Sequence, residues 1–423
     1  MASSATRDRM GRRGRIALEG IGPAPRRPVD ASVRRFLAWA VPMRPPFVRL
    51  VVAVALAVAS VGVAASGVFA ASDLAACTLQ PTEGDAPEQL GTILESVAIT
   101  GPQDVWAVGS HVVGGVSTAY AERWDGAAWA VQDLHLPLGP TSISSLYDVT
   151  AFGPDDVWAV GTWMGDDALI RHWDGSSWSA EKPPALPGTE RILTAIDGTG
   201  PDDLWAVGQQ WLGDQMHGIV LHRTAAGWTV VTPPPGAAVL HDVAMLQAGV
   251  PLVAGWSIGK QGFAEALLAA RETGAWTRER VPAAPGRNVF LTGLAVGRPG
   301  AAWAVGFSNE GPNGDAPLAL RRSGDGWKTV AVPDQGGSVR LASVATGDAG
   351  TVVVGQVSSG GLVRALALRA DGESWTPVPG AGDEPPDALA GVTLDGDAVW
   401  SVGRRVVVGA TYGIPSARVY SCG

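Results

Sequence analysis

Aromatic and acidic side chains occur together in the segments that follow a repeated glycine in this sequence. Trp163 and Trp211 are each followed, three residues later, by an aspartate, Asp166 and Asp214. The corresponding segments further along the chain carry other aromatic residues: Trp256, Phe307 and Tyr412. An aromatic ring can stack on the apolar face of a sugar, and a nearby carboxylate can accept hydrogen bonds from its hydroxyls. These seven residues are the candidate ligand-binding residues, although the same rings would also serve to cover loop edges.

Patterns typical of catalytic or metal sites are missing from the sequence. The six histidines show no metal-ligand spacing, and the two cysteines, Cys77 and Cys422, are too far apart in sequence to form a zinc motif. There is no Gly-x-Ser-x-Gly elbow and no phosphate-binding loop. We therefore expect no catalytic residue, no metal and no cofactor, and we favour a binding protein over an enzyme.

A short phrase that ends in glycine sets the organisation of the chain. Asp-Val-Trp-Ala-Val-Gly ends at Gly109 and occurs seven times with changes, and its last residues are Gly109, Gly161, Gly208, Gly255, Gly306, Gly355 and Gly403. Consecutive glycines are 52, 47, 47, 51, 49 and 48 residues apart. A period near 50 that contains only strand-like runs is typical of propeller blades. The sequence therefore predicts an all-β, seven-bladed β-propeller of four-stranded antiparallel blades.

Each period contains four apolar runs separated by turn signals. In the second period the runs are residues 146–152, 157–161, 168–173 and 178–181. Gly153-Pro154-Asp155 and Asp174-Gly175 mark two of the turns between them. Runs of this length between such signals indicate strands. Because side chains alternate along a strand, Trp106 and Val108 share one face, and we expect the repeated tryptophans to fill the space between blades.

A second marker lies in the hairpin between the third and fourth strands. Asp125, Asp174 and Asp371 each stand four residues before a tryptophan, with glycine directly after the aspartate. A short carboxylate at this position can accept backbone N–H bonds across the turn. With these motifs, residues 91–423 resemble the Asp-box and tectonin-like β-propellers. The resemblance implies the fold, and it does not select among the hydrolases, lectins and assembly factors that share such repeats.

The last period stops after its third strand, near residues 416–422. A ring needs this gap to be filled, and residues 74–81, ahead of the first blade, are available to supply the missing strand. Pairing of these segments would place Cys77 beside Cys422. In an oxidising compartment the two would form a disulfide. The alternative is that Cys77 carries a lipid, because Leu74-Ala75-Ala76-Cys77 matches a lipobox.

Residues 50–72 form a run of 23 residues without a charge. As a helix this run would span about 34 Å, enough to cross a membrane. Arg44 and Arg49 precede it, so we expect the amino end to be cytoplasmic and the rest of the chain outside. The run is either a permanent transmembrane anchor or a signal peptide cleaved near Ala70, and the second becomes the better interpretation if translation starts at Met43.

Charge divides the chain into a basic amino end and an acidic body. Residues 1–49 carry eleven arginines and three acids, a balance of +8, whereas residues 73–423 carry 37 acids and 20 bases, a balance of −17. An acidic body repels phosphate groups, so we expect no nucleic-acid partner. The expected domains are an Arg-rich cytoplasmic segment (1–49), the membrane or signal segment (50–72), a linker with the ring-closing strand (73–90) and the propeller (91–423).

Three functional classes fit these features. The first is a non-catalytic extracellular binding module for a cell-envelope carbohydrate or a protein partner, which would use loops held on a rigid scaffold. The second is a glycan hydrolase or lyase that uses the same loops. The third is a structural scaffold of an envelope complex.

Overall fold

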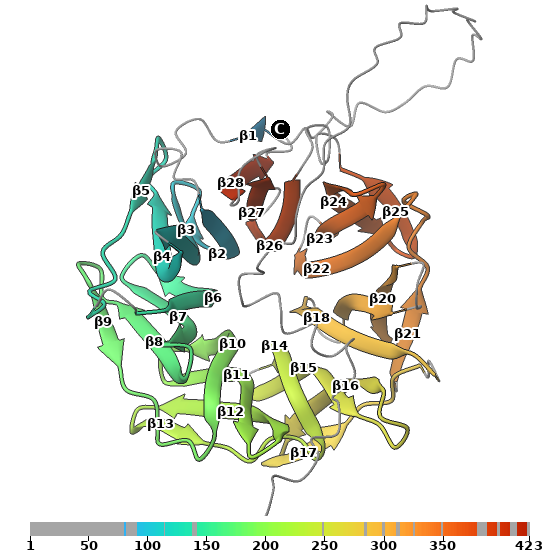
Figure 1. Cartoon of the computed structure of the whole chain (residues 1–423), viewed down its shortest axis with the longest axis horizontal. Helices are drawn as coiled ribbons and strands as arrows, with labels where there is room; N and C mark the ends of the chain where they lie inside the picture. The colour runs from blue at the N-terminus through green and yellow to red at the C-terminus, as the bar shows by residue number, and fades with distance from the viewer. Residues whose placement is uncertain are drawn as a thin grey trace, which may run out of the picture. The chain divides into compact units, whose positions relative to one another are not determined.

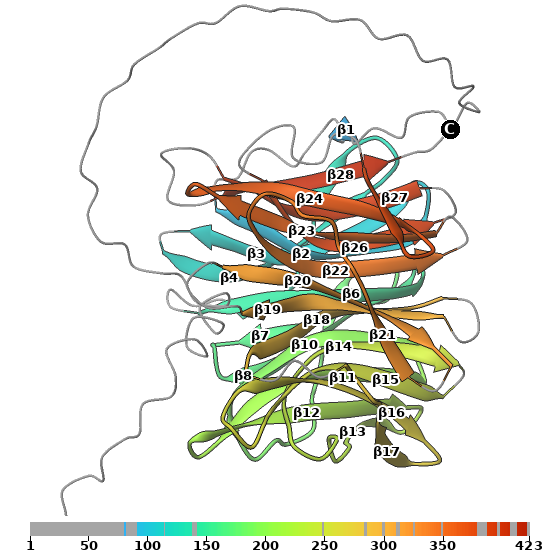
Figure 2. The same ribbon diagram turned by 90° about the vertical axis from the view of Figure 1, so that its right-hand side faces the viewer.

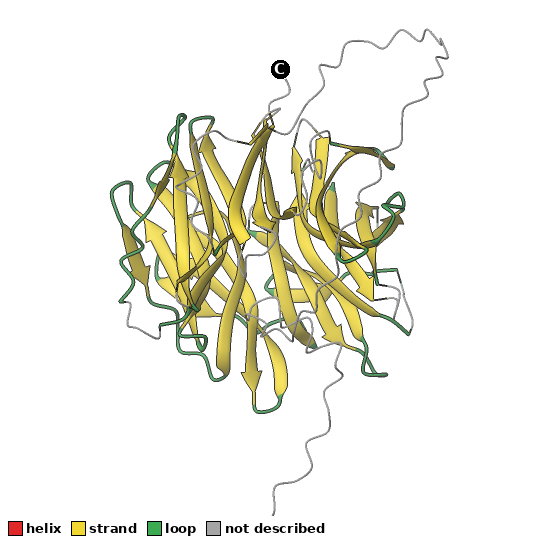
Figure 3. Cartoon of the chain, turned by 45° about the horizontal axis from the view of Figure 1, so that its top comes forward, coloured by secondary structure: helices red, strands yellow, loops and turns green. Residues whose placement is uncertain are grey.

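The computed structural model describes residues 80–81 and 91–420, with gaps at 114, 138–141, 248, 283–285, 298–300, 310–313, 325, 348–349, 379–386, 396–397 and 407–412. For residues 80–81 and 413–420 only the backbone pairing is described. The chain divides into two units, Met1–Ala70 and Ala71–Gly423, and every described residue belongs to the second. The described residues form strands and no helix (Figure 3), so none of them belongs to a helix that could span a membrane.

Twenty-four of the described strands form six antiparallel sheets, each made of four consecutive strands (Figure 1). Blade 1 contains β2 (Thr92–Gly101), β3 (Asp104–Val113), β4 (Val116–Trp124) and β5 (Trp129–Val131). Blade 2 contains β6 (Ser144–Gly153), β7 (Asp156–Trp163), β8 (Asp167–Trp173) and β9 (Trp178–Glu181). Blade 3 contains β10 (Thr189–Gly200), β11 (Asp203–Leu212), β12 (Gln215–Thr224) and β13 (Gly227–Val230).

The remaining three of these sheets have the same organisation. Blade 4 contains β14 (Ala237–Gln247), β15 (Val250–Ile258), β16 (Ala264–Glu272) and β17 (Ala275–Arg278). Blade 5 contains β18 (Asn288–Val296), β19 (Ala302–Asn309), β20 (Asp315–Ser323) and β21 (Gly326–Val330). Blade 6 contains β22 (Ser338–Gly347), β23 (Gly350–Ser359), β24 (Leu362–Asp371) and β25 (Ser374–Pro377). The first strand of each blade lies innermost in the ring.

The prediction of seven like blades and an N-terminal helix requires a correction. Six blades, not seven, are built from four consecutive strands, because the strand that completes the last described sheet is β1, which precedes the first blade. The last described sheet is instead a composite of β26 (Asp387–Asp395), β27 (Ala398–Val406), β28 (Gly413–Tyr420) and β1 (Gln80–Pro81). The pairs Gln80↔Val419 and Pro81↔Arg418 confirm the expected strand donation for two residues. The expected helix over residues 50–72, and both Cys77 and Cys422, lie outside the described residues, among which no disulfide is found.

The strands run along the ring axis, so their connections gather on two opposite faces (Figure 2). The hairpin face carries the turns between first and second strands and between third and fourth strands. The variable face carries the loops between second and third strands and the connections between sheets. The runs predicted for the second period are confirmed, because β6 to β9 each contain one of them.

Two of the three hairpin aspartates accept the backbone hydrogen bonds that their position predicts. Asp125 Oδ1 accepts hydrogen bonds from the N–H groups of Ala127 and Ala128, each at 2.9 Å. Asp174 Oδ1 accepts the equivalent bonds in blade 2, together with one from the hydroxyl of Ser176, and these bonds lower its pKa to about 2. The third hairpin is tighter, because Asp371 pairs directly with Ser374.

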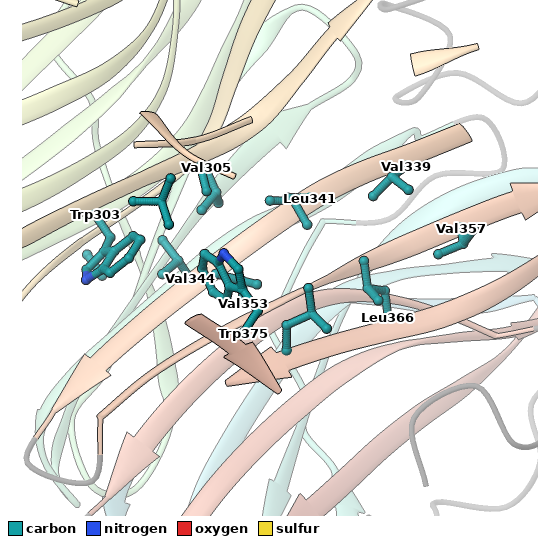
Figure 4. Packing of buried hydrophobic residues seen from close by; sticks show 13 residues of the cluster. Trp303, Val305, Val339, Leu341, Val344, Val353, Val357, Leu366 and Trp375 are labelled. Carbon is teal, nitrogen blue, oxygen red and sulfur yellow. The ribbon is translucent and has the colours of Figure 1, made fainter. Parts of the chain in front are cut away.

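The hydrophobic core lies between sheets rather than inside any one of them. Among the described residues, seven clusters of buried side chains each join one sheet to the next, including the composite sheet to blade 1. Trp303 of blade 5, for example, packs against Trp375 of blade 6, with ring centroids 5.5 Å apart (Figure 4). The prediction that the repeated tryptophans fill the space between blades is confirmed for Trp106, Trp158, Trp205, Trp303 and Trp400.

Candidate functional site

Every innermost strand has a break in its register at the same point. A leucine pairs with the repeated glycine of the second strand, and the next residue has no partner, which is the mark of a β-bulge. The bulge residues are Glu95, Tyr147, Thr194, His241, Thr292, Ala342 and Ala390. A bulge turns side chains out of the regular alternation, and here all of these residues except Ala342 line the central cavity.

The central cavity has a volume of about 360 Å³, and the innermost strands of all seven sheets line it. Its described wall carries hydroxyl and carboxyl groups from Ser96, Thr150, Asp148, Asp197 and Asp242 and includes no lysine or arginine. This volume is within the usual range for small-molecule sites, which is roughly 300–1,000 Å³. We therefore take the cavity as the candidate functional site.

Three of the cavity aspartates connect neighbouring blades. Asp148 of blade 2 accepts a hydrogen bond from the Ser96 hydroxyl of blade 1 at 2.6 Å and from the Ile196 N–H of blade 3 at 2.7 Å. Asp242 of blade 4 accepts the Leu294 N–H of blade 5 at 2.6 Å. A third carboxylate, Asp197, accepts the Met245 N–H at 3.1 Å. All three carboxylates therefore hold the ring together.

Burial shifts the pKa of each of these groups. Loss of water around the carboxylate raises the pKa of Asp148 to about 6 and that of Asp197 to about 7, although hydrogen bonds act in the opposite direction. Burial, with the nearby charge of Asp148, raises the pKa of Asp242 well above its ordinary value. Burial also lowers the pKa of His241 to about 4, so that imidazole is neutral at neutral pH.

Glu95 differs from the three aspartates because its carboxylate makes no hydrogen bond to another described residue. Burial raises the pKa of Glu95 to about 7, and the charge of Arg404 on β27 only partly opposes that shift. Tyr147 stands on the neighbouring innermost strand, and burial together with the Glu95 charge raises its pKa to about 12. Titratable groups with such shifts are common at functional sites.

The sequence did not single out Glu95, Tyr147 or His241, but it contains a signal that marks them. A Leu-x-x-aliphatic pattern precedes each repeated glycine by 14 or 15 residues, as in Leu94-Glu-Ser-Val97 and Leu240-His-Asp-Val243. The variable second position of this pattern is the bulge residue. Among the described residues, no group of three or more His, Cys, Asp or Glu side chains is arranged to hold a metal.

The residues proposed from sequence do not form one surface. Trp163 is half-buried and packs against the core between blades 1 and 2. Asp166 is exposed, but it accepts the Glu190 N–H at 2.5 Å and pairs with Arg191, so it fastens the loop that leads into blade 3. Trp211 is half-buried, and Asp214 is exposed in the turn between β11 and β12.

The two aromatic residues expected further along the chain lie in the core. Trp256 and Phe307 are 1% and 4% exposed, and Phe290 lies between them, with ring centroids 5.7 Å and 5.2 Å away. Arg340 lies over the Phe307 ring at 4.7 Å. These side chains support the wall between blades 4, 5 and 6 in this structure. Tyr412 lies outside the described residues.

Solved structures resemble this chain in fold. An ulvan lyase, described as a new family of polysaccharide lyase and bound to GlcA(1-4)Rha3S, is 10% identical with a TM-score of 0.50, over 80% of this chain and 95% of the lyase. The fucose-specific lectin of Aleuria aurantia is 10% identical with a TM-score of 0.45, over 70% of this chain and 98% of the lectin. A protein of unknown function from Dyadobacter fermentans is 12% identical with a TM-score of 0.46, over 81% of this chain and 98% of that protein.

The chain has the fold of a β-propeller. At these identities the likeness concerns the fold alone. The chain matches no family model and no curated protein, so the Asp-box or tectonin-like assignment has no further support.

Proposed function

We propose that this propeller is a non-catalytic carbohydrate-binding module whose ligand enters the central cavity from the variable face. One observation carries the proposal, namely a cavity of about 360 Å³ that all seven sheets line with hydroxyl and carboxyl groups. Sugars are recognised by such convergent polar groups in a concave site. The ulvan lyase, similar in fold, was solved with a saccharide bound, which adds modest support.

The binding model assigns different roles to the cavity and to its surroundings. Tyr147 lines the cavity and supplies an aromatic ring for the apolar face of a sugar. Trp211 and Asp214 in one loop of the variable face, and Trp163 and Asp166 in another, would contact a longer chain as it leaves the cavity. Tyr412 stays a candidate of the same kind, whereas Trp256 and Phe307 would act by supporting the wall.

A glycan array with the full-length chain tests the proposal. We expect binding to at least one glycan class, and we expect Tyr147→Ala to weaken it tenfold or more. Val230→Ala is the matched control, because Val230 is exposed on the outermost strand β13, far from the cavity in the sheet order. Binding that survives Tyr147→Ala but is lost in Trp163→Ala and Trp211→Ala would move the site to the loops. The absence of any glycan binding would contradict the proposal and favour a structural scaffold or a protein partner.

An enzyme acting on glycans is the second candidate function, and Glu95 is the observation that favours it. A carboxyl group with a pKa near 7 is suited to general acid or base chemistry. A hydrolase of the usual two-carboxylate type needs a second available carboxylate, whereas Asp148, Asp197 and Asp242 all hold backbone N–H groups. Turnover of a panel of glycosides and uronates that Glu95→Gln abolishes would establish the enzyme in place of the binding module.

We also propose that residues 50–72 tether the propeller to the outer face of a cell membrane, or direct its secretion with cleavage near Ala70. The uncharged run and the arginines ahead of it support this location. Protease added to intact cells should digest the propeller from outside, and the amino-terminal sequence of the mature protein would reveal cleavage. Digestion only after lysis would contradict this location.

The proposed disulfide between Cys77 and Cys422 depends on the same export. The pairing of β1 with β28 ends close in sequence to both cysteines, because Gln80, three residues after Cys77, pairs with Val419, three residues before Cys422. The intact mass should therefore correspond to two fewer hydrogens before reduction than after it. A lipid-sized mass increase on Cys77 would support the lipobox interpretation instead.

A further inference from the structure

Glu95 is the one carboxyl group of the described cavity wall that the propeller itself leaves without a hydrogen-bond partner. The other three acids of the wall, Asp148, Asp197 and Asp242, each accept a backbone N–H group from an adjoining blade. Removing those three would weaken the ring, whereas Glu95 has no comparable structural task. Glu95 is half-buried in the cavity wall, so its carboxylate is available to a ligand in the cavity.

The surroundings of Glu95 supply little that would neutralise its charge. Tyr147 and Asp148 lie on β6, and burial keeps the Tyr147 phenol protonated at neutral pH. On the other side, β26 contributes Ala390 and Gly391, which carry no charge. Gly391 allows close contact there, because a Cβ at that position would stand 2.7 Å from the Glu95 carbonyl oxygen.

The described cavity wall carries acidic side chains but no side chain that is positively charged at neutral pH. Four acids line the cavity, and its one imidazole, His241, is held neutral by burial. No lysine or arginine is among the described lining residues, and Arg404, whose charge acts on Glu95, lies on the second strand of the composite sheet outside that lining. A cavity with walls of one sign concentrates ligands of the opposite sign.

We propose that the cavity selects a saccharide that bears a primary ammonium group, and that the Glu95 carboxylate is the counter-ion for this group. This inference rests on the carbohydrate-binding function proposed above and names the ligand class for that site. An ammonium group has three N–H donors, which suits a site rich in carboxyl and hydroxyl oxygens that can accept them. The innermost strands would shield the ion pair from water in part, which strengthens it relative to a surface pair.

The inference fixes the direction in which the affinity for the ligand changes with pH. An ammonium group binds ionised Glu95, and burial raises the pKa of Glu95 to about 7. Asp148 and Tyr147 on β6 and Arg404 on β27 are the titratable or charged groups that bear on it. Affinity for the ammonium ligand should therefore rise with pH up to about 7, by at most about tenfold per pH unit, and then level off. A neutral sugar that displaced water from the carboxylate would show the opposite slope.

Calorimetry with the full-length chain and two matched ligands tests the inference. The probes are 6-amino-6-deoxy-D-glucose and D-glucose, which differ only in one ammonium or hydroxyl group. At slightly alkaline pH we expect the amino sugar to bind at least tenfold more tightly. Glu95→Gln, which keeps the shape of the side chain, should abolish both this preference and the rise of affinity with pH. Glu272→Gln, an exposed acid at the hairpin-face end of β16, is the matched control and should change neither.

The possible failures are distinct. Equal binding of the two sugars, or a preference for the amino sugar that persists in Glu95→Gln, would overturn the inference and leave carbohydrate binding intact. No binding of these sugars or of any arrayed glycan would overturn the proposed function as well. Thermal unfolding of Glu95→Gln at the wild-type midpoint would show that a lost preference comes from the site and not from misfolding.

Discussion

At the scale of single residues, the aspartate that opens the repeat phrase organises the tryptophan beside it. Asp156 Oδ1 accepts hydrogen bonds from Trp158 Nε1 at 2.7 Å and from His172 Nε2 at 2.9 Å. The two rings are stacked, with centroids 4.0 Å apart and planes 18° apart. The next blade repeats the arrangement with Asp203, Trp205 and His222. The sequence predicted that Trp158 is a core residue, but the role of His172 depends on the pairing of β7 with β8.

This arrangement predicts the effect of removing its carboxylate. Asp156→Ala leaves the Trp158 and His172 donors unsatisfied in a largely buried setting, so we expect a loss of about 1–3 kcal/mol in the free energy of unfolding. Denaturant titration measures it. The neighbouring Asp155→Ala removes an exposed carboxylate and should cost less than about 0.5 kcal/mol. Equal losses in the two variants would show that the hydrogen bonds of Asp156 do not stabilise the blade.

At the scale of strands, the repeated glycine is required by the bulge in the innermost strand. A Cβ at Gly208 would stand 1.9 Å from the Ile192 carbonyl oxygen, and the other six repeated glycines meet the equivalent backbone oxygen at 1.9–2.1 Å. The sequence showed that these glycines recur. It did not show why, because the bulge forms only when the innermost strand pairs with the second strand.

The same geometry gives a matched pair of substitutions in blade 3. Gly208→Ala forces the backbone of two strands apart, so we expect a loss of about 3 kcal/mol or more. Gly200→Ala adds the same methyl group where nothing lies within 4 Å, and it should have little effect on stability. Thermal unfolding of both variants measures the difference. A stable Gly208→Ala variant would mean that the bulge can relax without cost.

Strands and hairpins could be predicted because their signals are local. The four runs of the second period and the Asp125 and Asp174 turns depend on residues a few positions apart, and all are confirmed. The candidate site could not be predicted in the same way. Glu95, Tyr147 and His241 come together only when the innermost strands converge, whereas Trp256 and Phe307 turn inward to fill the wall.

At the scale of the whole molecule, closing the ring puts carboxyl groups where water is scarce. Asp148, Asp197 and Asp242 hold neighbouring blades together and also influence one another by charge, which adds to the effect of burial on the pKa of Asp197 and Asp242. No single blade has this property, because the groups approach one another only around the axis. The stability of the whole ring should therefore depend on pH, and these three carboxyl groups should be its main titrating groups.

The contribution of Asp197 to this response has a definite sign. Its pKa is raised from 3.8 to about 7 on folding, so the folded chain keeps a proton that the unfolded chain has released. The stability supplied by that proton is fully present below about pH 4 and is lost as the pH rises to about 7, with a slope of about 1.4 kcal/mol per pH unit. Asp197→Asn removes this term, and its amide oxygen can still accept the Met245 N–H.

The free energy of unfolding of Asp197→Asn, relative to the wild type, should therefore increase steadily between about pH 4 and pH 7. His241 is neutral in the fold, so its contribution to the free energy of unfolding increases with pH, opposite to that of Asp197. This contribution is the same in both proteins and cancels in the difference. Asp214→Asn changes an exposed carboxylate and should give a curve parallel to the wild type. Denaturant titrations across this range decide the matter, because a parallel curve for Asp197→Asn would mean that water reaches this carboxylate in the folded ring.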